Sequence, residues 1–140
     1  MRRPGSEVYV NKVAYRLSDR TAPEPDLSFV ATGRAHIARH GYMDGPPDLA
    51  IEVVSPESVR RDYEDKRERY TAGGVQEYWI LDPDERRATI LCREDDRFVE
   101  IRSDGEFESR VLPGLRLDTR SFWRRPLPPA LPILQELLAR

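Results

Sequence analysis

An acidic residue in the middle of a predicted strand limits how this chain can fold. In residues 48–54, Leu49, Ile51 and Val53 form one apolar row, because side chains alternate between the two faces of a strand. Glu52 falls on the opposite row. A buried ionised carboxylate is costly unless it is paired, hydrogen-bonded or bound to a metal. Two interpretations stay open: Glu52 forms a salt bridge with an arginine, or it is a metal ligand.

A charged helix is predicted directly after this strand, across residues 58–72. A serine–proline turn ends the strand, and a pair of glycines supplies the C-terminal stop of the helix. Asp62, Lys66 and Tyr70 share one helix face, because they are spaced four residues apart. Lys66 is one of only two lysines, and an ammonium is a compact charge that fits beside a reacting phosphate or water. We expect Lys66 to point across the sheet toward Glu52; the alternative is a surface pair with Asp62.

A second acid is predicted to lie near Glu52. Residues 26–31 also alternate, with Asp26 and Val30 on the same row. If the two strands are adjacent and antiparallel, and the loop between them is centred, Asp26 lies opposite the neighbourhood of Glu52 and Val30 opposite Asp48. Asp48 itself lies about 13 Å from Glu52 at roughly 3.3 Å per residue. We therefore expect Asp48 to start the strand or to support the site, and not to share an ion with Glu52.

The rest of the chain predicts one sheet-rich domain over residues 1–120. Further strands are expected within residues 7–17, 76–81, 88–93, 98–101 and 107–112. Residues 32–47 are predicted to form an irregular loop. Its His36 and His40 have the spacing of a helical zinc pair, but no third ligand follows at a matching spacing, so a polar loop is expected. Residues 121–140 are expected to form a proline-rich joint and a short amphipathic helix over residues 130–138.

Composition restricts the class of protein. A chain of 140 residues can bury one real core, and 39% hydrophobic with 34% charged residues is typical of a soluble globular domain. The net charge of -2 argues against a uniformly basic nucleic-acid-binding surface, while a local basic groove remains compatible. No apolar run approaches the roughly 20 residues that span a bilayer, and the N-terminus lacks the apolar core of a signal peptide. Cys92 is the single cysteine, so the chain cannot form an intrachain disulfide, which fits a reducing compartment. A cytoplasmic location is therefore predicted.

Four pieces of sequence combine into one pattern across about residues 8–120. They are Pro25-Asp26, PDLAIEVVSPES at 47–58, the set Asp62, Lys66 and Tyr70, and GGVQEYWILDP at 73–83. This pattern resembles the Uma-type restriction endonuclease family within the PD-(D/E)XK nuclease superfamily. The resemblance implies an α/β fold of α+β character, in which helices flank a mixed sheet with a restriction-endonuclease-like core. It also implies divalent-metal-dependent hydrolysis of phosphodiester bonds in DNA.

The resemblance implies a catalytic set. Asp26 matches the first acid and Glu52 the second, and these carboxylates, with the backbone carbonyl of Val53, would hold Mg²⁺ or Mn²⁺. The superfamily places its lysine two residues after the second acid, where this chain has Val54. In the Uma-type group the lysine has moved to the following helix, and Lys66 occupies that position. Lys66 would orient the attacking water or offset charge on the phosphate.

Other side chains are expected around this set. Support is expected from Asp48, Asp62 and Tyr70, and contacts with DNA backbone phosphates from Arg60, Arg61, Arg67 and Arg69. The resemblance further implies a helical segment before the first strand, which this sequence lacks; the expected consequence is instability, completion by a homodimer, or inactivity. Two hypotheses follow. Two acids and a lysine favour a magnesium-dependent DNA endonuclease, whereas the missing helix and the mildly acidic balance favour an inactive nuclease fold that binds nucleic acid or protein.

Overall fold

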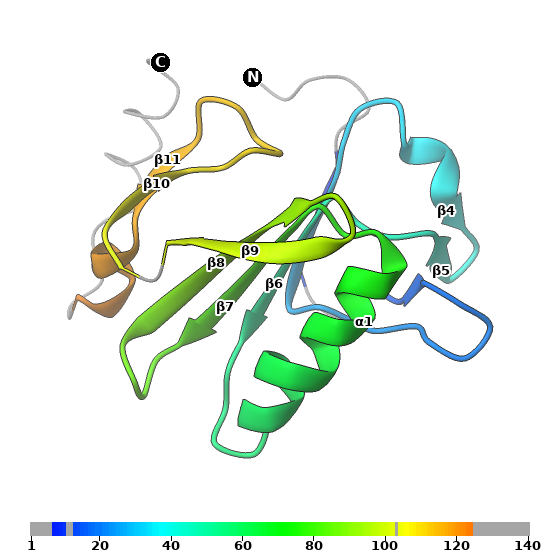
Figure 1. The fold of residues 1–140 in the computed structure, drawn as a ribbon. Helices are drawn as coiled ribbons and strands as arrows, with labels where there is room; N and C mark the ends of the chain where they lie inside the picture. The colour runs from blue at the N-terminus through cyan, green and yellow to red at the C-terminus, as the bar shows by residue number, and fades with distance from the viewer. Residues whose placement is uncertain (1–6, 11–12, 103, 125–140) are drawn as a thin grey trace.

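The computed structural model describes residues 7–10, 13–102 and 104–124. A six-stranded mixed sheet forms its centre, and Figure 1 shows the arrangement of its elements. The strand order is β1-β3-β6-β7-β8-β9. Neighbours pair antiparallel except β6 and β7, which are parallel. The bounds are β1 Glu7–Val10, β3 Leu27–Val30, β6 Leu49–Val53, β7 Glu77–Asp82, β8 Arg87–Glu94 and β9 Arg97–Arg102. The predicted mixed sheet is therefore confirmed.

The pairing of β3 with β6 sets the position of the predicted acids. Leu27 lies opposite Ile51 and Phe29 opposite Leu49 in an antiparallel register. Continued by one residue, this register places Asp26 opposite Glu52, as the centred loop predicted. The predicted alternation is also confirmed, because the odd-numbered residues of β6 and the even-numbered ones pack into different core clusters.

The parallel step from β6 to β7 runs through a helical segment that widens at its start. A π-helical segment, η2 (Arg61–Asp65), leads directly into α1 (Lys66–Gly73). The Lys66 N–H donates to the carbonyl oxygen of Arg61, five residues earlier, which is the π-helical pattern. The predicted helix is present, but its first turns are wider than the expected α-helix. Gly74 ends α1 in the left-handed region with a φ of 90°.

The two faces of the sheet are covered differently. On one face, α1 packs Tyr70 against Tyr78 and Ala50. On the other, the hairpin of β10 (Glu106–Glu108) and β11 (Arg116–Asp118) places Phe107 edge-on against the core residue Trp79. Within the described residues, α1 therefore covers one face of the mixed sheet and a β-hairpin covers the other.

The loop between β3 and β6 is more regular than predicted. It holds a 3₁₀ turn, η1 (Ala35–Ile37), and two strands, β4 (Ala38–Arg39) and β5 (Tyr42–Asp44), which join β2 (Tyr15–Arg16) in a three-stranded sheet. His36 lies in η1 and His40 follows β4, so the two histidines do not share a helix.

The last element of the described residues is a 3₁₀ turn, η3 (Thr119–Trp123). The predicted proline-rich joint and the amphipathic helix over residues 130–138 lie outside the described residues. Within the described part of the chain, no helix has the length and apolar character needed to span a membrane.

Candidate active site

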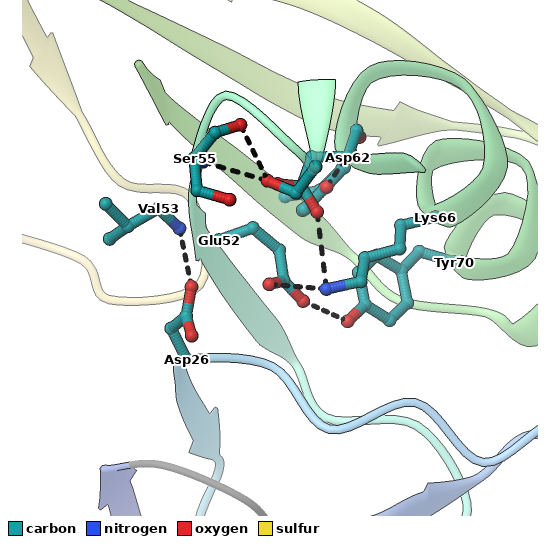
Figure 2. Close-up of polar contacts among 9 residues, drawn as sticks. Asp26, Glu52, Val53, Ser55, Asp62, Lys66 and Tyr70 are labelled. Carbon is teal, nitrogen blue, oxygen red and sulfur yellow. Dashed lines mark hydrogen bonds and ion pairs between the residues drawn. The ribbon is translucent and has the colours of Figure 1, made fainter. Parts of the chain in front are cut away.

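A buried ion pair between β6 and α1 forms the centre of the candidate site (Figure 2). Lys66 Nζ lies 2.7 Å from Glu52 Oε2, and the Glu52 side chain is only 2% exposed. Glu52 comes from the row of β6 that faces the helix, and Lys66 is the first residue of α1. Lys66 is thus directed at Glu52, as expected, and the arginine partner considered as an alternative is not the one found.

Tyr70 closes the other side of the Glu52 carboxylate. One turn after Lys66, its hydroxyl donates to Glu52 Oε1 at 2.8 Å. Burial raises the pKa of the Glu52 carboxyl above its usual value, and the hydrogen bonds from Lys66 and Tyr70 offset part of this rise. Burial and the negative charge of Glu52 both raise the pKa of the Tyr70 hydroxyl. Tyr70 therefore acts here as a hydrogen-bond donor that holds Glu52 in one orientation.

Asp62 brings a second buried carboxylate to the same lysine. Its side chain is 2% exposed, and Oδ1 lies 3.3 Å from Lys66 Nζ but has no hydrogen-bond partner. Oδ2 accepts a hydrogen bond of 2.6 Å from Ser58 Oγ. Ser58 Oγ in turn accepts from the backbone N–H of Ser55 just after β6, which ties the start of the helical segment to the end of the strand. We call Glu52, Asp62, Lys66 and Tyr70 the Lys66 cluster.

Asp26 lies beside the Lys66 cluster, at the edge where β3 begins. Its Oδ2 accepts a hydrogen bond of 2.7 Å from the backbone N–H of Val53 (Figure 2). Asp26 is half-buried and is more exposed than Glu52. The two acids expected to act together are therefore neighbours across the β3–β6 pair, and Asp26 is the one that solvent reaches more easily.

The structure does not bring every predicted residue to this site. Asp48 lies at the opposite end of β6, where its Oδ2 accepts from the Ala31 N–H at 2.8 Å and from Arg34 Nη1 at 2.9 Å. It anchors the loop that follows β3 and does not contact the Lys66 cluster. The expectation of a strand-start residue therefore fits Asp48 better than that of a supporting residue at the site.

The helix arginines lie in a mixed-charge surface. Arg60 pairs with Glu64 at 3.3 Å, and both side chains are exposed. The remaining members of this surface are the arginines Arg61, Arg67 and Arg69, with Arg67 half-buried, and the exposed acids Asp65 and Glu68. The helix arginines therefore do not form a purely basic patch, and their contact with DNA stays a prediction.

The charge of the site suits a divalent cation. The Glu52 and Asp62 carboxylates face one ammonium, and the Asp26 carboxylate lies beside them on the Val53 N–H, so acidic groups outnumber the lysine in the site. The donors are all oxygen atoms, and hard oxygen ligands suit Mg²⁺ or Mn²⁺. Within the described ranges no three acidic, histidine or cysteine side chains converge as a ready-made metal cluster. An ion held by two carboxylates and a backbone carbonyl, the set predicted from sequence, requires no such cluster.

Two residues of the site were not predicted from the sequence. Ser58 is 2% exposed and holds Asp62, and the Tyr78 hydroxyl donates to the backbone carbonyl of Asp62 at 2.7 Å. Ser58 lies within the SPES stretch that carried the resemblance, so its position was a usable signal. No comparable signal indicated a role for Tyr78 at the site, because a tyrosine in a predicted buried strand is expected to be a core residue.

Comparisons with known proteins show the family and the fold of the chain. Residues 1–120 match the model of the Uma2 family, described as "putative restriction endonuclease". No curated protein matches this chain. Among solved structures, a "putative nuclease belonging to DUF820" from Anabaena variabilis has a TM-score of 0.66 and 18% identity, and the match covers 85% of this chain and 68% of that one. That likeness shows a shared fold, and the family match over most of the sequence shows that the chain belongs to the Uma2 family of restriction-endonuclease-like proteins.

Proposed function

We propose that this protein is a metal-dependent endonuclease that hydrolyses phosphodiester bonds of DNA. The observation that carries the proposal is the meeting of two acids and a lysine from three separate segments: Asp26 before β3, Glu52 in β6 and Lys66 in α1. A fold kept only for its shape has no need of a buried lysine between two buried carboxylates, because such groups are costly to desolvate.

Each residue has a task in this proposal. Asp26, Glu52 and the backbone carbonyl of Val53 would hold Mg²⁺ or Mn²⁺, which when bound supplies a Lewis acid for the phosphate and lowers the pKa of a water ligand. Lys66 would donate hydrogen bonds to a nucleophilic water or to a phosphate oxygen as negative charge builds on it. Tyr70 keeps Glu52 oriented so that its oxygens do not rotate away.

The test combines metal binding with DNA cleavage. Calorimetry with Mg²⁺ and Mn²⁺ and nicking of supercoiled plasmid would be measured on the wild type, Asp26→Asn and Glu52→Gln. Asparagine can still accept the Val53 N–H, so Asp26→Asn keeps the local hydrogen bond while it removes the charge. Glu57→Gln is the matched control, because Glu57 is an exposed acid in the turn after β6.

We expect both site variants to lose metal binding and nicking, and Glu57→Gln to retain both. A folded wild type that binds neither ion and leaves plasmid intact would overturn the proposal. The inactive nuclease-fold module would then be the better description. Analytical ultracentrifugation of the same samples would test the predicted homodimer.

A further inference from the structure

A second polar group lies next to the Lys66 cluster on the same face of the sheet. Asp82, at the end of β7, is 4% exposed, and its Oδ2 accepts a hydrogen bond of 3.0 Å from the hydroxyl of Tyr63. The guanidinium of Arg87, at the start of β8, lies over the Tyr63 ring with its carbon 5.2 Å from the ring centre. None of these three residues was predicted to have a role at the site.

The widened turn links this group to the site. Asp62 and Tyr63 are consecutive in the π-helical segment, yet both point to the sheet: Asp62 contacts Lys66 and Tyr63 contacts Asp82. Consecutive residues of an α-helix are about 100° apart, and the looser π-helical turn lets both reach inward. The same π-helical turn therefore positions Asp62 against Lys66 and Tyr63 under the guanidinium of Arg87.

Arg87 lies opposite the buried Asp82 in the β7–β8 pair, and its interactions with Tyr63 and Asp82 raise the pKa of its guanidinium. The oxygens of Asp82 are occupied by the Tyr63 hydroxyl and by the Glu85 N–H at 3.1 Å. Within the described residues Arg87 forms no ion pair, and its side chain is exposed. Stacking occupies one face of the guanidinium, and because the side chain is exposed, N–H donors at its edge can reach a planar, bidentate partner.

The sheet register gives the distance to the catalytic set. Glu52 pairs with Ile80 and Ile80 with Thr89, so two strand spacings separate the Glu52 and Thr89 backbones, and Arg87 lies two residues further along β8. At about 4.8 Å per strand and 3.3 Å per residue, the Glu52 and Arg87 backbones are roughly 12 Å apart. Successive phosphates of one DNA strand rise about 3.4 Å each. An arginine at this distance can contact a backbone phosphate a few nucleotides away from a scissile phosphodiester bond that lies at Glu52.

We propose that Arg87, stacked on Tyr63, is a substrate-binding residue that contacts a backbone phosphate of the DNA strand flanking the scissile bond. This inference rests on the proposed nuclease function and adds a phosphate contact outside the helix arginines. The contact positions the strand and carries no information on base sequence, because it is made with the backbone.

The test measures the salt dependence of DNA binding. Binding of a fluorescent duplex oligonucleotide would be followed by anisotropy in EDTA, over a salt series, for the wild type, Arg87→Gln, Arg87→Lys and Arg86→Gln. Arg86 is the matched control because it is the adjacent exposed arginine, outside the Tyr63 stack. One lost phosphate contact lowers the slope of log affinity against log salt by about 0.9.

We expect wild-type affinity to fall about 3.5-fold more than that of Arg87→Gln between 50 and 200 mM salt, which is the effect of one contact. Arg86→Gln should keep the wild-type slope. Arg87→Lys should also keep the slope but bind more weakly, because the positive charge remains while the planar, bidentate guanidinium is lost. Equal slopes for Arg87→Gln and the wild type, an equal drop in Arg86→Gln, or no duplex binding by the wild type would each overturn the inference.

The same proteins separate this inference from the proposed function. If the wild type nicks plasmid with Mg²⁺ while Arg87→Gln keeps the wild-type salt slope, the nuclease proposal stands and the Arg87 contact is wrong. If binding depends on Arg87 but no nicking occurs with either ion, the contact stands and the nuclease proposal fails.

Discussion

Removing the Lys66 charge should destabilise the fold strongly. Lys66→Met keeps an unbranched apolar chain of similar length but leaves the Glu52 and Asp62 carboxylates, each 2% exposed, without their ammonium. Breaking a buried pair by removing one partner costs about 3–5 kcal/mol. We take the lower end, about 3 kcal/mol, because Lys66 itself is 14% exposed and protonation of Glu52 relieves part of the repulsion.

Urea unfolding measures this loss. With a slope of about 2 kcal/mol per molar urea, a loss of 3 kcal/mol lowers the midpoint by about 1.5 M at neutral pH. The control is Arg67→Met, which removes a neighbouring charge from the same helix and should cost less than about 1 kcal/mol. Equal midpoints for the two variants would refute the assignment of Lys66 as the partner of two buried acids.

Two further variants test the hydrogen bonds and the ionisation of the site. Tyr78→Phe leaves the Asp62 carbonyl without its hydroxyl donor, so we expect a loss of about 1–3 kcal/mol in urea unfolding and slower nicking, with exposed Tyr42→Phe as an unaffected control. The pKa of Glu52 is raised in the folded state, so the folded protein binds its proton more tightly than the unfolded chain does, and ionisation of Glu52 costs stability as pH rises from 4.5 through the folded pKa. The stability of Glu52→Gln relative to wild type should therefore improve from acid to neutral pH, and a constant or opposite difference would contradict the burial argument.

Patterns with a fixed period made part of this fold predictable. The alternation in residues 48–54 placed Glu52 on the face covered by α1, and alternation in residues 26–31 placed Asp26 on the same face. A one-residue slip in register would move every side chain to the wrong face, so two alternating strands joined by one loop leave few pairings. Helical spacing placed Asp62, Lys66 and Tyr70 on one face, whereas the direction of Lys66 toward Glu52 was a functional interpretation of that face.

Features without a period were missed. β4 and β5 hold two and three residues, which is too short for an alternation to show, so the loop after β3 was predicted to be irregular. The π-helical segment has the same helix-forming residues as an α-helix and differs only in which carbonyl each N–H selects. Its consequence, the inward direction of both Asp62 and Tyr63, could therefore not be read from α-helical spacing.

The second carboxylate on Lys66 explains how a buried pair can remain adaptable. If Asp62 were absent, any event that drew Glu52 away from Lys66 would leave a mostly buried ammonium without a partner, which is a costly state. Asp62 Oδ1 already lies 3.3 Å from Nζ and has no hydrogen-bond donor of its own, so it can accept the ammonium after a small side-chain rotation. Ser58 and Tyr78 fix Asp62 from its other oxygen and from its backbone. Asp62 is thus a second, firmly held acceptor for the Lys66 ammonium, which lowers the cost of weakening the Glu52 pair.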